Sequence, residues 1–145
     1  TTIIKLLLRF YDPQEGAIFI NGYNLRAINL PYWRQQIGTI LQDFNRYAYS
    51  LHENVVFGDV IKPVSGANFQ RAIRQAEAKE LLERLPRREK TILAKEFHQG
   101  VDLSTGEWQK IALARAFYRQ APILILDEPT AAIDAPSEAR IFARI

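Results

Sequence analysis

Two adjacent carboxylates, Asp127 and Glu128, directly follow an apolar run at 123–126, and Pro129 ends that run. Four apolar residues of this kind predict a short strand, so that the acids would stand at its carboxyl end. Nucleotide-hydrolysing α/β folds present acids to Mg²⁺ and to water at this position. The pattern therefore indicates one acid associated with a metal ion and one general base.

A second stretch suited to phosphate lies upstream, at Leu103-Ser104-Thr105-Gly106-Glu107. It opens a helical pattern that runs to about Tyr118, and the N-terminus of a helix offers free N–H groups and a positive dipole end. Ser104 supplies a hydroxyl donor, and Gly106 supplies an amide that can come close to a phosphate because glycine lacks a Cβ. Taken alone, these five residues are also compatible with a simple helix cap.

Together, these stretches resemble three motifs of the ABC-type ATPases. LSTGEWQK is similar to their LSGGQ signature loop, ILILDEPT to their Walker B strand, and AAID to their D-loop. The 24 positions from Leu103 to Asp127 make the combination specific. The resemblance implies that ATP and Mg²⁺ are the cofactors and that the parent protein is an ATPase.

The resemblance also implies a role for each matching residue. In this family two nucleotide-binding domains face head to tail, and each signature loop caps the nucleotide held by the partner. Ser104 and Gly106 would therefore contact the partner's ATP, and Asp134 would contact the partner across the dimer. Asp127 would bind Mg²⁺ through coordinated water, and Glu128 would polarise the attacking water. The alternative for Asp127 and Glu128 is a strand end with two solvated acids.

A further strand is predicted at 37–41, with Gln42 at its carboxyl edge. By resemblance Gln42 is the Q-loop glutamine, which touches Mg²⁺ or the attacking water, so we count it among the catalytic and the metal-binding residues. The alternative is a surface glutamine at a strand end.

The N-terminal stretch 1–22 resembles the segment that follows the Walker A lysine in exporter-type ABC domains. Thr1 would then be the hydroxyl residue that ligates Mg²⁺, and Thr2 would lie beside it among the cofactor-binding residues. The phosphate-loop glycines and lysine, an adenine-stacking aromatic residue and the switch histidine would all fall outside the chain. We therefore expect a piece of a longer protein, truncated at both ends, which alone binds ATP weakly and hydrolyses it negligibly.

The signature loop departs from the family pattern at two positions, Thr105 and Glu107. If position 105 requires a positive φ, a β-branched threonine is strained there. Glu107 places a carboxylate near bound phosphate, which is unfavourable unless an Arg or Lys lies close. On this basis Thr105→Gly or Glu107→Gln is predicted to tighten ATP-dependent dimerisation. Arg115, on the signature helix, is predicted to form a structural ion pair.

Residues 47–58 (YAYSLHENVVFG) resemble the region where the transmembrane domain docks on exporter-type ATPases. Tyr47, Tyr49 and Phe57 are expected either to anchor that domain or to pack in the core. His52 is predicted to be a surface histidine. The lead-in to the signature contains Glu96, a loose match to the glutamate with which exporters sense the membrane domain.

These motifs imply an α/β fold: a P-loop NTPase-like ABC ATPase core with an inserted α-helical subdomain, present as a partial domain. Residues 1–44 and 119–145 would form parts of the RecA-like core, and 45–118 the mainly helical subdomain. Local patterns predict an apolar helix at 1–10 buried against a sheet, a strand at 17–20 with an Asn21-Gly22 hairpin turn, a short helix at 30–36 and helices within 59–83.

Composition limits the partners. The 145 residues are 48% hydrophobic and 24% charged, with a net charge of +3. Lys and Arg do not form the stripe that a nucleic-acid site would need. The chain has no cysteine, and no apolar run long enough to cross a membrane. By resemblance the partners are a second nucleotide-binding domain and a transmembrane domain fused upstream, at the cytoplasmic face of the plasma membrane.

The predicted function is ATP hydrolysis that powers solute transport, in the direction of export. One alternative is a soluble ABC-type ATPase that acts on translation or DNA and has no membrane domain. Another is a degenerate partner domain that does not hydrolyse ATP, which the departures at Thr105 and Glu107 suggest and which Glu128 argues against.

Overall fold

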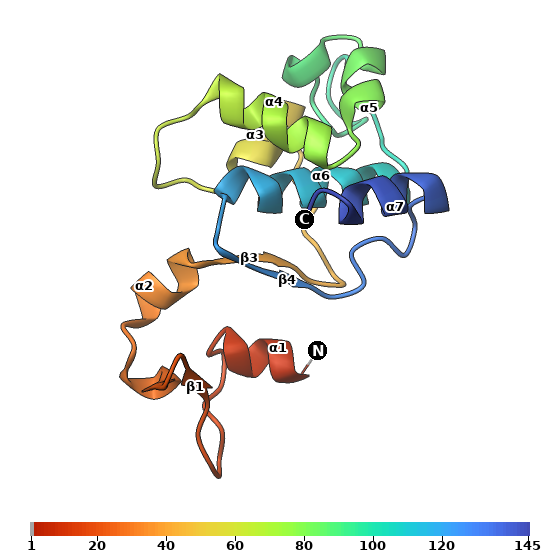
Figure 1. The fold of residues 1–145 in the computed structure, drawn as a ribbon. Coiled ribbons are helices and arrows are strands. Elements are labelled where there is room, and N and C mark those ends of the chain that lie inside the picture. The colour runs from red at the N-terminus through yellow and green to blue at the C-terminus, as the bar shows by residue number, and fades with distance from the viewer. Residues whose placement is uncertain (1) are drawn as a thin grey trace.

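The computed structural model describes residues 2–145, and Figure 1 shows the arrangement of their elements. The α-helices and strands are, in chain order, α1 (Thr2–Leu7), β1 (Phe19–Ile20), β2 (Tyr23–Asn24), α2 (Leu30–Gln35), β3 (Ile37–Ile40), α3 (Leu51–Val56), α4 (Gly66–Gln75), α5 (Lys79–Arg84), α6 (Thr105–Arg119), β4 (Ile123–Leu126) and α7 (Ala135–Phe142). Two short 3₁₀ helices, Leu25–Ala27 and Arg88–Lys90, complete the list.

Strands β3 and β4 lie side by side as a parallel pair, although their first residues, Ile37 and Ile123, are 86 positions apart in the chain. Alternate side chains point to opposite faces of a strand, and the two faces here join two different apolar clusters. Ile37, Ile123 and Ile125 belong to the smaller cluster, which includes Leu8 and Trp33. Ile40, Leu124 and Leu126 contribute to the larger cluster around α3, α4 and α6. The sheet therefore lies between the two cores.

Helix α6 organises the larger cluster. It is the longest helix of the described chain, at 15 residues, and eight of its residues are buried. It packs against α3 and α4 on one side and against β3 on another. The larger cluster also takes in Ile40 and Ile141, which lie outside 45–118. The division into a RecA-like core and a helical subdomain stays a prediction.

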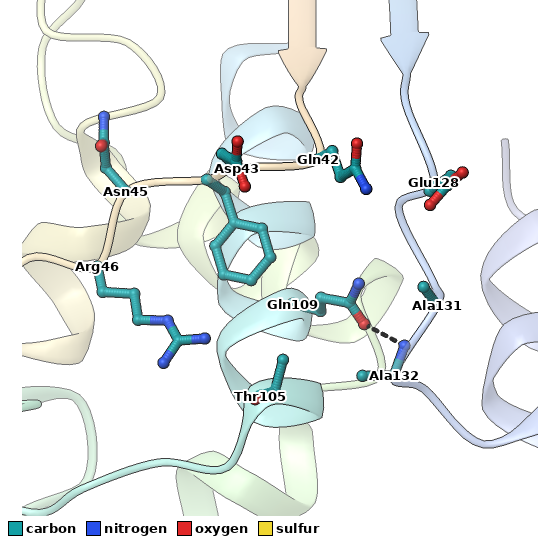
Figure 2. A pocket seen from close by; sticks show the side chains of 10 residues that line it. Gln42, Asp43, Asn45, Arg46, Thr105, Gln109, Glu128, Ala131 and Ala132 are labelled. Carbon is teal, nitrogen blue, oxygen red and sulfur yellow. Dashed lines mark hydrogen bonds between the residues drawn. The ribbon is translucent and has the colours of Figure 1, made fainter. Parts of the chain in front are cut away.

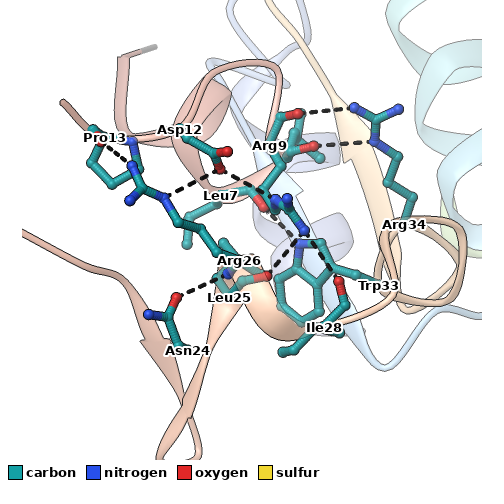
Figure 3. Close-up of polar contacts among 11 residues, drawn as sticks. Leu7, Arg9, Asp12, Pro13, Asn24, Leu25, Arg26, Ile28, Trp33 and Arg34 are labelled. Atoms are coloured by element: carbon teal, nitrogen blue, oxygen red, sulfur yellow. Dashed lines mark hydrogen bonds and ion pairs between the residues drawn. The ribbon is translucent and has the colours of Figure 1, made fainter.

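The predicted helix at 1–10 is wrong in its length and in its burial. Helix α1 ends at Leu7, none of its residues is buried, and Arg9 adopts a left-handed backbone with φ 51°. Backbone hydrogen bonds close the end of the helix, from Phe10 N to Lys5 O and from Arg9 N to Leu6 O, and side chains of α2 bind the carbonyl groups of residues 7–9 (Figure 3). Trp33 Nε1 donates to Leu7 O at 2.7 Å, and Arg34 donates to the next two carbonyls at 3.2 and 3.0 Å.

The hairpin turn is confirmed. Strands β1 and β2 pair in antiparallel register, and Asn21 and Gly22 connect them with φ values of 50° and 83°. Two consecutive positive φ angles are typical of the two-residue turn that an Asn-Gly pair favours. Strand β1 is shorter than the predicted strand at 17–20, and each strand of the hairpin has two residues. The short helix α2 and the strand β3 agree with their predictions to within one residue.

Candidate functional site

The structure brings Gln42 and Glu128 to one edge of the β3–β4 sheet. Ile40 pairs with Leu126 at the carboxyl ends of the two strands, and the N–H of Asp127 extends the pairing by donating to Ile40 O at 2.9 Å. Gln42 and Glu128 each lie two residues beyond this pair. Both side chains line a pocket of about 470 Å³ (Figure 2). Carboxyl ends of parallel strands are where open α/β sheets bind ligands.

The pocket combines residues from three segments of the chain. The Q-loop segment contributes residues around Gln42, α6 contributes Thr105 and Gln109, and the segment after β4 contributes Glu128, Ala131 and Ala132. Arg46 supplies a cationic side chain at the pocket (Figure 2). Side-chain amides, the carboxylates of Asp43 and Glu128 and one guanidinium thus line one cavity, which suits a ligand with charged and polar groups.

Glu128 has an unusual backbone. Its φ of 50° lies in the left-handed region, which costs a residue with a Cβ on the order of 1–3 kcal/mol. The side chain is exposed toward the pocket, while the following Pro129 is buried. Strain of this kind concentrates at functional sites. This conformation could not be predicted from the residue type, since glutamate has no preference for this region.

The signature helix begins with a capping box. The Ser104 side chain accepts from the N–H of Glu107 at 3.3 Å, and Glu107 Oε2 accepts from the N–H of Ser104 at 2.8 Å. The Ser104 hydroxyl also donates to Glu107 Oε2, at 2.9 Å. The helix-cap alternative is therefore realised in this structure. Ser104 itself stays exposed.

Both concerns about the signature departures are answered by the structure. Thr105 is the first residue of α6, and it is not among the described residues with positive φ, so the strain argument at this position does not apply. Arg84 of α5 forms an ion pair with Glu107, so a basic group does lie close. Partial burial by itself raises the pKa of Glu107. Hydrogen bonds from the Ser104 N–H, the Arg84 guanidinium and the Ser104 hydroxyl outweigh burial, so the pKa is lowered.

The D-loop segment packs against α6 in the same chain. Gln109 Oε1 accepts from the N–H of Ala132 at 2.8 Å (Figure 2). A Cβ on Gly106 would stand 2.4 Å from Ala132 O, so only glycine permits this approach of the two backbones. Sequence reasoning missed Gln109. The available signal was a polar residue beside Trp108 on the helix face that also carries Ile111 and Ala112, all of which are buried.

Asp134 caps helix α7. Its carboxylate accepts from the N–H of Ser137 at 2.9 Å, and hydrogen bonds from the backbone and side chain of Ser137 lower its pKa. The side chain is exposed, so capping does not remove it from the surface. Its contact with a partner domain stays a prediction.

The other predicted positions divide as follows. Thr1 lies outside the described residues. Thr2 is the exposed first residue of α1 and does not line the pocket. Asp127 is half-buried next to Glu128. Glu96 is exposed in the loop before α6.

Arg115 has a structural role, but the predicted ion pair is wrong. Its guanidinium donates to Asn54 O at 2.8 Å and to Asn54 Oδ1 at 3.2 Å, and it lies 4.8 Å from the centre of the Tyr47 ring. Burial lowers the pKa of Arg115, but an arginine this basic stays charged. Neutral acceptors and an aromatic face thus replace the carboxylate.

The aromatic residues before and after α3 form one cluster. The Phe57 ring lies 5.6 Å from Tyr47 and 5.4 Å from Tyr49, both edge to face. Tyr49 and Phe57 are exposed, and Tyr47 is half-buried. His52 is half-buried, not a fully surface residue, and stacks at 5.0 Å from the Phe69 ring.

Oxygen-donor residues suit a hard cation at this edge of the sheet. Mg²⁺ is commonly held by one or two carboxylates, with its remaining ligands supplied by water and substrate phosphates. Asp127 and Gln42 provide donors of this type at adjacent strand ends. Among residues 2–145, no three of His, Cys, Asp and Glu gather as a metal-ligand group. The donor set fits a cation whose remaining ligands are phosphate oxygens.

No helix between Thr2 and Ile145 has the length and apolarity needed to cross a membrane.

Comparison with known proteins adds a family. Residues 1–131 match a family model described as ABC transporter. The chain is 38% identical to the subtilin transport ATP-binding protein SpaT of Bacillus subtilis, over 97% of this chain and 23% of that protein. It is 43% identical to the ATP-dependent lipid A-core flippase of Alkalilimnicola ehrlichii, again over 97% of this chain and 23% of the relative.

A solved structure has the same fold. A bacterial Atm1-family ABC exporter with ATP bound superimposes with a TM-score of 0.88 at 33% sequence identity, over 99% of this chain and 24% of that one. The chain thus spans about a quarter of the length of the proteins it matches.

Proposed function

Because the chain belongs to the ABC transporter family and has the α/β fold of the P-loop NTPase-like ABC ATPases, we propose that it forms part of the ATP-hydrolysing domain of an exporter. The observation that carries the proposal is the pocket shared by Gln42 and Glu128 at adjacent parallel strand ends, with Thr105 of the signature helix on its wall. The relatives are named for different transported substances, subtilin and lipid A-core, so the part that they share with this chain is the proposed ATP-hydrolysing domain.

The chemistry assigned to the chain is hydrolysis of the terminal phosphate of ATP. Glu128 accepts a proton from the attacking water, and Gln42 orients that water from the neighbouring strand end. Asp127, Gln42 and Thr1 would hold Mg²⁺, and Thr2 would join Thr1 among the residues that bind the cofactor. Bound Mg²⁺ neutralises the charge on the phosphates. The position of Glu128 on the wall of the same pocket as Gln42 supports this assignment.

The partner in this proposal is a second nucleotide-binding domain, arranged head to tail. Ser104 and Gly106 cap the ATP held by that partner, and Asp134 contacts it across the interface. Ser104 and Asp134 are both exposed, which supports access from outside. A transmembrane domain in the same protein docks on the cluster of Tyr47, Tyr49 and Phe57, at the cytoplasmic face of the membrane. The exposure of Tyr49 and Phe57 supports such docking.

The test is steady-state ATPase activity of the intact transporter that contains this chain, with Mg²⁺ present. Glu128→Gln is expected to lower kcat by at least about 100-fold with a smaller change in KM, because general-base catalysis contributes about 10²–10⁴. The control is Glu83→Gln, since Glu83 is an exposed acid of α5 outside the pocket. An unchanged kcat in Glu128→Gln would overturn the assignment. An inactive wild type would favour the degenerate partner domain.

A second experiment concerns the chain by itself. Mg-ATP is titrated into the 145-residue chain and into a version extended upstream through a phosphate loop and downstream past a switch histidine. Only the extended version is expected to bind tightly and hydrolyse, because the glycine amides and lysine of a phosphate loop supply most of the phosphate contacts. Mg²⁺-dependent hydrolysis by the shorter chain would contradict this.

A further inference from the structure

Both polar groups of Ala132 face helix α6. Gln109 Oε1 accepts from its N–H at 2.8 Å, and its carbonyl lies so near Gly106 that a Cβ there would stand 2.4 Å from the oxygen. The two α6 residues are three apart, so they lie on one face of the helix. One turn of α6 therefore holds one residue of the segment 129–134 from two sides.

The side chain of Gln109 is a buried polar group that makes a hydrogen bond to Ala132. Its side chain is 6% exposed, and a buried amide costs free energy unless it is hydrogen-bonded. The hydrogen bond that Gln109 makes goes to a loop and not to its own helix. Ala132, by contrast, is exposed, so its N–H could be satisfied by water if Gln109 were absent. The contact thus fixes the loop more than it stabilises the core.

The loop so held begins at Glu128. Only three residues separate Glu128, with its left-handed backbone, from Ala132. Within this stretch Ile133 N donates to Thr130 O at 2.9 Å, and Thr130 Oγ1 donates to Glu138 of α7 at 2.5 Å. These bonds tie the turn to itself and to α7, whereas the Gln109 bond ties it to α6. Gln109 and Glu128 also line the same pocket (Figure 2).

We propose that Gln109 is a positioning residue, whose amide oxygen fixes the turn 129–132 on α6 and thereby holds Glu128 in its place at the pocket. The proposal rests on the proposed function, since it assigns Gln109 to the same hydrolysis reaction. Gln109 acts through Ala132 and takes no proton itself. The signature helix and the strand-end acid then move as one unit in each domain.

Two variants separate the hydrogen bond from packing. Gln109→Leu keeps a side chain of similar bulk and removes the acceptor. Gln109→Glu keeps an acceptor oxygen in either protonation state. The matched control is Gln75→Leu, at the half-buried end of α4, away from the turn.

The first readout is amide hydrogen exchange at Ala132 in the intact transporter without nucleotide. Gln109→Leu is expected to speed exchange at Ala132 by at least about tenfold, because the N–H loses its acceptor. Gln109→Glu and Gln75→Leu are expected to stay near wild type. Equal protection of Ala132 in wild type and Gln109→Leu would overturn the proposal.

The second readout is the split between kcat and KM for ATP. Gln109→Leu is expected to lower kcat by about 10- to 100-fold, the range that a displacement of about 1 Å can cause, with KM within about threefold. Gln109→Glu is expected to recover most of kcat. If wild type hydrolyses ATP and Gln109→Leu matches it, this inference fails while the proposed function stands. If wild type does not hydrolyse ATP, the proposed function fails, and with it the catalytic role given to Gln109.

Discussion

Arg84, at the end of α5, forms an ion pair with Glu107 in the first turn of α6. The pair joins residues 23 positions apart and neutralises the carboxylate that replaces the usual glutamine of the signature loop. Glu107 is 22% exposed, and its carboxylate also closes the capping box with Ser104. Arg84 therefore compensates for the negative charge that Glu107 introduces into the signature loop.

Removal of the Arg84 cation should weaken ATP-dependent association of two domains. Arg84→Ala is expected to weaken ATP-dependent association of two domains by about two- to fivefold, because it exposes phosphate to an unpaired carboxylate and exposed pairs are worth about 0.2–1 kcal/mol. The double variant Arg84→Ala/Glu107→Gln is expected to regain the wild-type affinity. The single variant Glu107→Gln is the fourth member of this double-mutant cycle. Association is measured by light scattering at low and high salt. A loss that persists at high salt, where such charges are screened, would contradict the electrostatic explanation.

Thr105→Gly should not relieve strain. Thr105 has an ordinary helical backbone, so glycine is expected to lower the free energy of unfolding by roughly a few tenths of a kcal/mol, the difference between the helix propensities of threonine and glycine. Urea unfolding of both proteins measures the change. A gain of about 1 kcal/mol or more would show that the residue is strained after all.

Gly58 should tolerate no side chain. A Cβ at this position would stand 2.0 Å from Arg115 O and 2.9 Å from Arg115 C, both backbone atoms of α6. Gly58→Ala is expected to lower the free energy of unfolding by at least about 2 kcal/mol, because the end of α3 must move away from α6. The control is Gly66→Ala, since no atom lies within 4 Å of a Cβ there. Equal stability of the two variants in urea would argue against this packing.

Acid should weaken the attachment of α7. Burial by itself raises the pKa of Glu77, but hydrogen bonds from Arg140, at 2.6 Å, and from Arg144 outweigh it and lower the pKa. A lowered folded-state pKa gives stability that is fully present above the ordinary glutamate pKa of about 4.3 and is lost as the pH falls through the folded-state value.

The matching measurement is thermal unfolding between about pH 3 and pH 7. Over the acid part of this range the Tm of wild type is expected to fall further than that of Glu77→Gln. The difference corresponds to about 1 kcal/mol in the free energy of unfolding. The other carboxyls with lowered pKa, Glu53 and Glu107 among them, titrate equally in both proteins. Parallel Tm curves for the two proteins would contradict the role of Glu77.

Arg115 should be irreplaceable by lysine. Its guanidinium donates to two oxygens of Asn54 and lies over the Tyr47 ring. The ammonium group of lysine is a compact charge without this planar, forked arrangement of donors. Arg115→Lys is expected to cost about 1–3 kcal/mol of stability, measured by urea unfolding. Arg87→Lys, in an exposed loop, is the control. A cost below about 0.5 kcal/mol would show that charge alone matters here.

Local sequence determined the parts of this chain whose physics is local. The Asn21-Gly22 turn, the strands β3 and β4 and the start of α6 at Ser104 follow from preferences that act within a few residues. The position of Gln42 and Glu128 at one edge could also be predicted, since parallel strands end on the same side.

Tertiary structure decided the contacts between distant segments. The partner of Glu107 is Arg84, the partner of Gln109 is the backbone of Ala132, and Arg115 binds amide oxygens instead of an acid. Side chains of α2 bind the carbonyl groups at the end of α1. None of these follows from spacing along the chain, because each depends on how helices pack in three dimensions, and packing selects partners by geometry from many residues of suitable chemistry.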